Sequence, residues 1–347
     1  MIRQLQFIVT AEEARQRLDY VLASRVGELS RIRIANLLAA GACQVNQETQ
    51  RAGYHVITGD QVEFRFDDAD APTAMTAENI PLDILYEDDE IIVVNKPSGM
   101  LVHPTRNSKS GTLLNALTYH LNEGRLPDGA VVRPGLIHRL DRATSGVMVI
   151  AKTQRALSIL TAHFQQKRVF KRYVAVVHGR LPDDEGVIIA PLGEDRNRQP
   201  PRWVTPEGKY AETRFRVIER LQAATLVELE PVTGRTNQLR IHLAYIGHPI
   251  IGDELYGESG VRSQESGVES ATAHSNSLLR ETKDSLPSLN DPTPDSRLPT
   301  PDPVRLCLHA ARLEFHQPTG GEWRQFQSPL PAGISHLWRR LQEAEET

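Results

Sequence analysis

One aspartate lies among arginines in the segment from Arg133 to Gly146. Arg139 and Arg142 flank Asp141, and neighbouring cations favour the ionised form of a carboxylate, which can then act as a nucleophile. A structural interpretation also exists, because an aspartate in a turn can cap the backbone and pair with an arginine. Taken alone, this segment favours the structural interpretation.

A second candidate segment, residues 231–242, carries Arg235 and Arg240 after a glycine turn. If residues 238–242 are extended, Gln238, Arg240 and His242 share one face. Arg240 would then fix a carboxylate while Arg235 contacts a phosphate. Without further context, the segment is an ordinary basic strand.

A third segment, residues 167–173, alternates basic residues with Phe170 and Tyr173. This composition suits RNA, because phosphates attract cations and unstacked bases need a ring to stack on. The alternative is a solvated helix end followed by a tyrosine of the core.

The elements that would position these segments fall into two domains. Residues 1–66 form a small unit with helices over 15–25 and 31–40 and strands near 43–45 and 61–64. An acidic linker over 67–83 follows, and then a domain over 84–347. Its predicted elements are strands at 91–94, 147–151, 173–177, 224–229 and 313–315, and a helix capped by Thr153.

The order of these elements is not a regular strand–helix alternation, so we expect an α+β fold with a mixed, mainly antiparallel sheet. Residues 258–303 contain no aromatic residue and are rich in Ser, Pro, Thr and acids. This composition predicts a disordered insertion within the second domain.

Charge is unevenly distributed along the 347 residues. The net charge is −4, yet residues 133–180 carry ten basic residues and one acid, whereas residues 67–90 carry nine acids and no base. A segregated pattern can bind a polyanion despite a negative sum. Two unrelated solvated faces are the alternative.

Several protein classes are excluded by what the sequence lacks. It has no run of 18 apolar residues, no nucleotide-binding glycine motif and no ligand spacing among its two cysteines and twelve histidines. We therefore expect a cytoplasmic protein, monomeric by default, that uses neither a cofactor nor a metal and does not enter a membrane.

Taken together, these segments resemble the RluA-type pseudouridine synthases, a family of RNA-modifying enzymes. The resemblance covers residues 84–257 and 304–331. It is carried by six motifs: Val94–Gly99, His138–Lys152, Lys171–Tyr173, Gly234–Arg240, Gly247–Asp253 and Leu308–Ala310. The first domain resembles an S4-type RNA-binding domain through Arg17–Asp19, Ser30–Arg31, Gly41, Val45–Asn46 and Gly59–Asp60.

The resemblance implies conversion of uridine to pseudouridine in structured RNA, with large-subunit ribosomal RNA favoured over transfer RNA. Asp141 would be the nucleophile and Arg240 its charge partner. Tyr173 would pack against the uracil, and a part in the final loss of the C5 proton is a second role open to it. Arg139 would fill the space left by the flipped base. The RNA-binding residues would be Arg15, Arg17, Arg31, Arg33, Arg139 and Arg235. The chain departs from the family pattern at Arg142–Ala143 and Asn237.

Two other classes compete with this interpretation. A non-catalytic RNA-binding or ribosome-assembly factor would need the basic surfaces but not Asp141, Tyr173 and Arg240 together. A glycosidase would normally pair two carboxylates, and the motif offers one.

Overall fold

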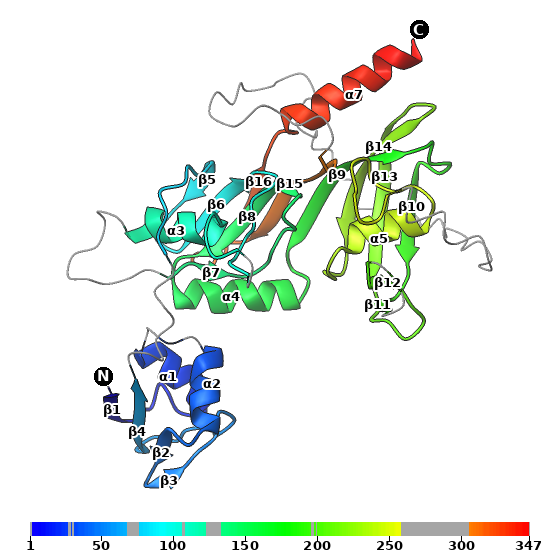
Figure 1. Cartoon of the computed structure of the whole chain (residues 1–347). Helices are drawn as coiled ribbons and strands as arrows, with labels where there is room; N and C mark the ends of the chain where they lie inside the picture. Colours follow the sequence, from blue (N-terminus) through cyan, green and yellow to red (C-terminus); the bar gives the residue numbers. More distant parts are fainter. Residues whose placement is uncertain are drawn as a thin grey trace. The chain divides into compact units, whose positions relative to one another are not determined.

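The computed structural model divides into two compact units, Met1–Ala77 and Glu78–Thr347 (Figure 1). It describes residues 2–26, 29, 31–67, 76–105, 108–122, 133–195, 198, 200–257 and 305–346. The predicted insertion at 258–303 and residues 68–75 of the predicted linker lie outside the described residues.

The first unit packs two helices on a four-stranded sheet of order β1–β4–β2–β3. Its elements are β1 (Ile2–Ile8), α1 (Leu18–Val26), α2 (Arg31–Ala39), β2 (Cys43–Val45), β3 (Glu48–Thr49) and β4 (Gln61–Asp67). Helix α1 begins three residues later than predicted because Arg15 has a left-handed backbone, with φ of 66°. Leu18, Leu22 and Phe64 are among the residues of its core.

The second unit begins at Glu78, six residues before the predicted boundary at 84. The Glu78 backbone amide donates to the Asn115 carbonyl, and its carboxylate accepts from the Gly111 amide. These contacts attach Glu78, within the predicted linker over 67–83, to the second unit.

A ten-stranded sheet forms the centre of the second unit, in the order β10–β13–β14–β9–β15–β8–β6–β5, with β16 on β15 and β7 on β8. Among the described pairs only β15–β8 is parallel, which confirms the predicted α+β class with a mixed, mainly antiparallel sheet. The strands are β5 (Ile84–Glu87), β6 (Ile91–Lys96), β7 (Gly135–Leu136), β8 (Ser145–Ala151), β9 (Phe170–His178), β10 (Glu185–Ile189), β13 (Glu212–Arg220), β14 (Ala224–Pro231), β15 (Leu308–His316) and β16 (Trp323–Gln327). Strands β11 (Leu192–Glu194) and β12 (Arg202–Val204) form a separate pair.

In the described part of the second unit, four helices accompany the sheet: α3 (Leu113–Asn122), α4 (Gln154–Gln165), α5 (Gln238–Tyr245) and α7 (Ala332–Glu345). Thr153 caps α4 through its side chain, as predicted. In the described part of the chain, no helix combines the length and apolar character that a membrane span requires.

Strand β8 is buried on both faces, as its unbroken apolar run predicts. Val147 and Val149 pack in the cluster that contains α4 residues, whereas Met148 and Ile150 pack in the cluster that contains α3 residues. Strand β8 is therefore a rigid support for the loop 137–144 that precedes it in the chain.

The two ends of β8 have different partners along one edge. Ser145 and Gly146 at its start pair with β15, while Ile150 and Ala151 at its end pair with β7. The Ser145 hydroxyl is 2.9 Å from His309 Nδ1 at the β15 contact. The loop 137–144 thus connects β7, which pairs with the end of β8, to the start of β8, which pairs with β15.

Candidate active site

Residues 141–144 are held against the turn at residues 97–100. The Gly99 amide donates to the Arg142 carbonyl at 2.8 Å, and Arg142 Nε donates back to the Gly99 carbonyl at 3.0 Å. The Ser98 hydroxyl donates to the Ala143 carbonyl at 2.7 Å. Asp141 therefore lies on a backbone fixed from both sides, with its side chain 25% exposed.

Lys96 also binds both the turn at 97–100 and the segment 141–144. Its fully buried ammonium donates to the carbonyls of Pro97 (2.8 Å), Met100 (2.9 Å) and Arg142 (3.3 Å). Burial lowers the pKa of Lys96 to about 7, and the charge of Asp141 opposes this shift. Two motifs that are separate in sequence thus meet around one side chain.

The His138 side chain supports the loop 137–144 by packing against β8 and α4. Its Nε2 accepts a hydrogen bond from the Val149 amide at 3.1 Å, and its ring stacks on Phe164 with centroids 4.8 Å apart. Burial, and secondarily the charge of Lys171, lower the pKa of His138 to about 3. The imidazole is therefore neutral, as an acceptor of an amide hydrogen bond must be.

The predicted extended conformation of 238–242 is wrong, because these residues form the first part of α5. Asn237 has a left-handed backbone with φ of 56°, which turns the chain into the helix. Gln238 and His242 then lie four residues apart on one helical face, and both contact the Thr213 hydroxyl. Arg240 lies on a different face from these two residues.

Arg240 approaches Asp141 from α5. Its Nη1 lies 4.0 Å from Asp141 Oδ2, within ion-pair range but beyond hydrogen-bond length. Burial disfavours the charge of Arg240, but hydrogen bonds and charge from Asp253, with the charge of Asp141, raise its pKa overall. Residues 99 positions apart are thereby brought together as the resemblance implies.

Tyr173 lies half-buried on β9 and packs against residues of two core clusters. Burial, with the charge of Asp141 adding to it, raises the pKa of its phenol. The hydroxyl therefore keeps its proton at neutral pH. Lys171, two residues earlier on the same face of β9, is half-buried beside Gly234, so the third sequence segment meets the second.

A family model described as RNA pseudouridylate synthase matches residues 90–245. The sequence is 35% identical to an uncharacterised RNA pseudouridine synthase of Bacillus subtilis, over 99% of each chain. It is 36% identical to ribosomal large subunit pseudouridine synthase D of Neisseria meningitidis, over 95% of this chain and 79% of that protein. This chain belongs to the RluA family of RNA pseudouridine synthases. The predicted enzyme class and reaction are confirmed.

Solved structures agree with this fold. Human RNA pseudouridylate synthase domain containing 4 matches with a TM-score of 0.54 and 25% identity, over 75% of this synthase and 93% of that chain. Human RNA pseudouridylate synthase domain containing 1 matches with a TM-score of 0.51 and 22% identity, over 78% and 97%.

The predicted RNA-binding arginines divide between the two units of the synthase. Arg139 and Arg235 are exposed in the second unit, where Arg235 Nε donates to the Tyr210 carbonyl at 3.1 Å. In the first unit, Arg17 and Arg31 flank buried Asp19, with Arg17 Nε 2.9 Å from Oδ1 and Arg31 Nε 3.5 Å from Oδ2 of its carboxylate. The full set of exposed candidates is Arg15, Arg17, Arg31, Arg33, Arg139 and Arg235.

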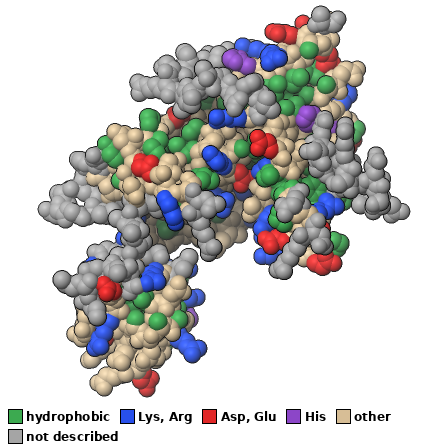
Figure 2. All heavy atoms as spheres, viewed as in Figure 1, with side chains coloured by type: hydrophobic (Ala, Val, Ile, Leu, Met, Phe, Trp, Pro, Cys, Tyr) green, Lys and Arg blue, Asp and Glu red, His purple; other side chains and the backbone are tan. Residues whose placement is uncertain are grey.

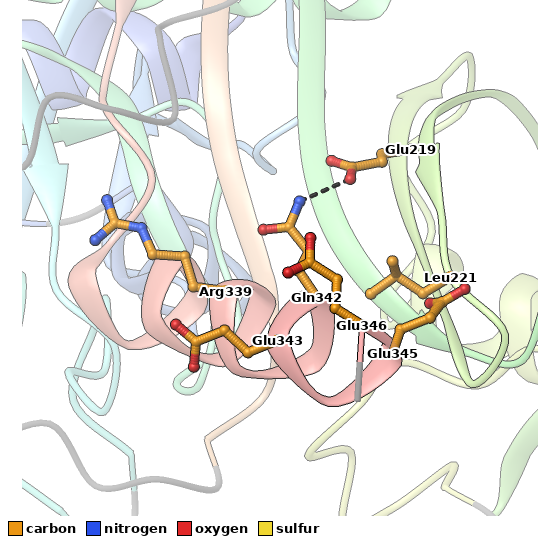
Figure 3. A pocket seen from close by; sticks show the side chains of 7 residues that line it. All are labelled: Glu219, Leu221, Arg339, Gln342, Glu343, Glu345 and Glu346. Carbon is orange, nitrogen blue, oxygen red and sulfur yellow. Dashed lines mark hydrogen bonds between the residues drawn. The ribbon is translucent and has the colours of Figure 1, made fainter.

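A pocket of about 420 Å³ lies elsewhere, between α7 and the β13–β14 connection (Figure 3). Four glutamates and one arginine are among its lining residues, and no residue of the Asp141 site is. An acidic lining repels phosphate, so this pocket does not suit RNA. The chemistry of the synthase is better placed at the Asp141 site.

Sequence reasoning missed Asp253 as a functional candidate, although it ends the motif Gly247–Asp253. Its carboxylate is fully buried and forms a two-pronged ion pair with Arg240. A signal was available: an acid directly after an apolar run and a glycine turn needs a cationic partner if it is buried. The sequence did not say which cation would supply it.

Lys96 predicts a pH dependence of stability. Its pKa is about 7 in the folded chain, against 10.5 for a free lysine. Between these values the unfolded chain binds more protons, so this group makes the free energy of unfolding rise with pH. We expect Lys96→Met to flatten that rise between about pH 7 and about pH 10.

Urea unfolding followed by tryptophan fluorescence measures this slope, because all three tryptophans belong to the second unit. Exposed Lys109, replaced by Met, is the control and should leave the slope unchanged. A Lys96→Met slope equal to that of the wild type would contradict the assignment.

Proposed function

We propose that this synthase converts uridine to pseudouridine in large-subunit ribosomal RNA, with Asp141 as its nucleophile. The observation that carries the proposal is the meeting of three side chains: Asp141 on its fixed loop, Arg240 Nη1 at 4.0 Å from Asp141 Oδ2, and half-buried Tyr173, whose phenol pKa is raised by burial and, secondarily, by the charge of Asp141. Relatives aligned over most of this chain are named ribosomal large subunit pseudouridine synthase D, which supports the choice of RNA. We infer action in the cytoplasm, as a monomer.

The reaction is an isomerisation. The bond from uracil N1 to ribose C1′ breaks, the base turns, and a bond from C5 to C1′ forms. The C5 proton is lost and N1 gains one, so no redox partner or energy source is consumed. An ionised Asp141 supplies the nucleophile that the opening step needs.

Arg240 and Tyr173 would complete the site. Arg240 offers a fixed positive charge that favours the ionised form of the Asp141 carboxylate and the charge developing on the base. Tyr173, kept in its phenol form, is suited to pack against the uracil ring. A raised phenol pKa argues against Tyr173 as the base that removes the C5 proton.

The uridine must leave its stack to reach Asp141, which costs a few kcal/mol and is cheapest in a loop. Arg139, exposed two residues before Asp141, would fill the vacated space, and Arg235 would contact a phosphate. The first unit would act as an S4-like RNA-binding domain through Arg15, Arg17, Arg31 and Arg33. Figure 2 shows Lys and Arg side chains at the surface of this unit.

Replacing Arg31 and Arg33 by alanine should weaken RNA binding and make it less sensitive to salt. Each lost phosphate contact lowers the slope of log affinity against log salt by about 1, so the double variant should lose about 2. Filter binding across a salt series measures the slope, and the rate at saturating enzyme should stay within about 3-fold.

Arg25→Ala is the matched control within the same unit. It removes one positive charge, but Arg25 is already bound to Glu13 by two hydrogen bonds and packs 4.2 Å from the Phe7 ring. The control should barely change the slope. An equal loss of slope per removed arginine in Arg25→Ala and in the Arg31→Ala, Arg33→Ala double variant would show that net charge, and not position, is what matters.

Mapping pseudouridine in total RNA from cells with and without the gene tests the substrate. Carbodiimide labelling with primer extension should reveal one or a few sites lost from large-subunit ribosomal RNA. Loss from transfer RNA alone would keep the reaction and overturn the proposed substrate.

A further inference from the structure

Asp253 grips one edge of the Arg240 guanidinium. Its Oδ2 accepts from Arg240 Nε at 2.7 Å, and its Oδ1 accepts from Nη2 at 2.6 Å. The Leu255 and Tyr256 amides also donate to Oδ1, each at 2.9 Å. The Asp253 side chain is fully buried, so its four hydrogen bonds hold it in one orientation.

Asp141 lies on the other side of the same guanidinium. Because Asp253 occupies Nε and Nη2, the group nearest Asp141 is Nη1, at 4.0 Å from Oδ2. Two carboxylates therefore share one cation unequally: the buried Asp253 through two hydrogen bonds, and the half-buried Asp141 through charge alone. Within the described residues no hydrogen bond is made to the Asp141 carboxylate, so its oxygens stay available for a bond to carbon.

Tyr256 supports the face of the guanidinium. The Arg240 Cζ lies 5.1 Å from the Tyr256 ring centroid, a favourable cation–ring arrangement. The Tyr256 hydroxyl accepts from Asn237 Nδ2 at 3.1 Å, and its ring stacks on Trp203. Asn237 is one of the positions at which the sequence departs from the family pattern.

The backbone that carries Asp253 has little freedom. Gly252 has a φ of +76°, and a Cβ at this position would lie 2.5 Å from the Arg305 carbonyl oxygen. The turn before Asp253 is therefore packed against Arg305, which lies just before β15. A fixed backbone and a saturated carboxylate are what a positioning group requires.

We propose that Asp253 and Tyr256 are positioning residues that aim Arg240 Nη1 at Asp141 while withholding the guanidinium from a direct hydrogen-bonded pair with it. This inference rests on the proposed role of Asp141 as nucleophile. Removing the grip of Asp253 frees Arg240 to pair with Asp141 directly, which would block its oxygens.

Asp253→Asn tests the inference by steady-state kinetics. The probe is total RNA from cells lacking the gene, labelled with tritium at uracil C5, from which pseudouridine formation releases tritium. We expect kcat to fall about 100-fold, since displacement of a reacting group by about 1 Å costs that much, with KM within about 2-fold.

Glu228→Gln is the matched control. Glu228 is a buried carboxylate of the same unit, bound to Arg172 at 2.7 Å and Arg216 at 3.1 Å. It pairs with Val174, so its side chain lies on the sheet face opposite to Tyr173. If both variants changed kcat by the same factor, Asp253 would be merely structural and the inference would be wrong.

A double-mutant cycle separates positioning from stability. In an Arg240→Gln background, Asp253→Asn should change kcat by less than about 2-fold, because the group that it aims is gone. A full 100-fold loss in that background would overturn the inference. Asp141→Asn is measured beside these variants to test the proposed nucleophile separately. An active Asp141→Asn protein would refute the proposed nucleophile and not the positioning role of Asp253.

Asp253→Asn leaves a buried arginine without its partner and can unfold the protein. In that case Tyr256→Leu tests the positioning role, because it removes the supporting ring without leaving an unpaired charge. We expect a loss of about 10-fold in kcat with KM unchanged, while Tyr256→Phe, which keeps the ring, stays near wild type. A folded Tyr256→Leu protein with wild-type kcat would overturn the inference.

Discussion

Asp141→Asn should reduce the rate of pseudouridine formation by about four orders of magnitude or more, since an amide cannot replace an ionised carboxylate as nucleophile. RNA affinity should remain within about 3-fold of the wild type, because phosphate contacts dominate it. Single-turnover tritium release measures the rate, and filter binding measures the affinity.

Asp89→Asn is the control for this prediction. It makes the same chemical change at an exposed position between β5 and β6, away from the Arg240 contact, and should leave both quantities unchanged. If Asp141→Asn kept the wild-type rate, or if its RNA affinity fell as far as its rate, the nucleophile assignment would be wrong.

Gly146→Ala should destabilise the second unit by about 3 kcal/mol or more. Gly146 has a φ of +118°, and a Cβ there would lie 2.2 Å from the Ala310 carbonyl oxygen and 2.6 Å from its nitrogen. Both contacts are to backbone, at the point where β8 pairs with β15. The added methyl must push these strands apart.

Tryptophan fluorescence during urea unfolding reports this loss. Gly247→Ala is the control, because Gly247 also has a positive φ, +85°, but no atom lies within 4 Å of its ideal Cβ. The control should cost only about 1–2 kcal/mol from backbone strain. Similar losses for the two variants would mean that β8 and β15 can separate without cost.

Local features of the sequence predicted the elements near the site well. The apolar run of β8 indicated a strand buried on both faces, and Thr153 indicated the start of α4. Both signals act within a few residues, so no tertiary contact was needed to interpret them. The family motifs added the meeting of Asp141, Tyr173 and Arg240.

The conformation of residues 238–242 was mispredicted for a physical reason. Polar and apolar residues alternate there, a period typical of a strand. The left-handed Asn237 and the shared contacts of Gln238 and His242 with Thr213 instead favour a helix. Tertiary hydrogen bonds outweighed the local pattern.

The sequence also could not predict that two aspartates share Arg240. Asp141 and Asp253 are 112 positions apart, and spacing alone gives no distance between them and the arginine. The parallel pairing of β8 with β15 could not be predicted for the same reason, because residues from distant parts of the chain form it. Such contacts depend on the folded sheet.

The most direct test of the central claim is complementation at a mapped uridine. Cells lacking the gene would receive either the wild-type gene or Asp141→Asn, expressed to equal protein levels, and pseudouridine would be mapped at each site lost in their absence. We expect the wild-type gene to restore every lost site in large-subunit ribosomal RNA and Asp141→Asn to restore none. Restoration by Asp141→Asn would contradict the assignment of Asp141 as the nucleophile.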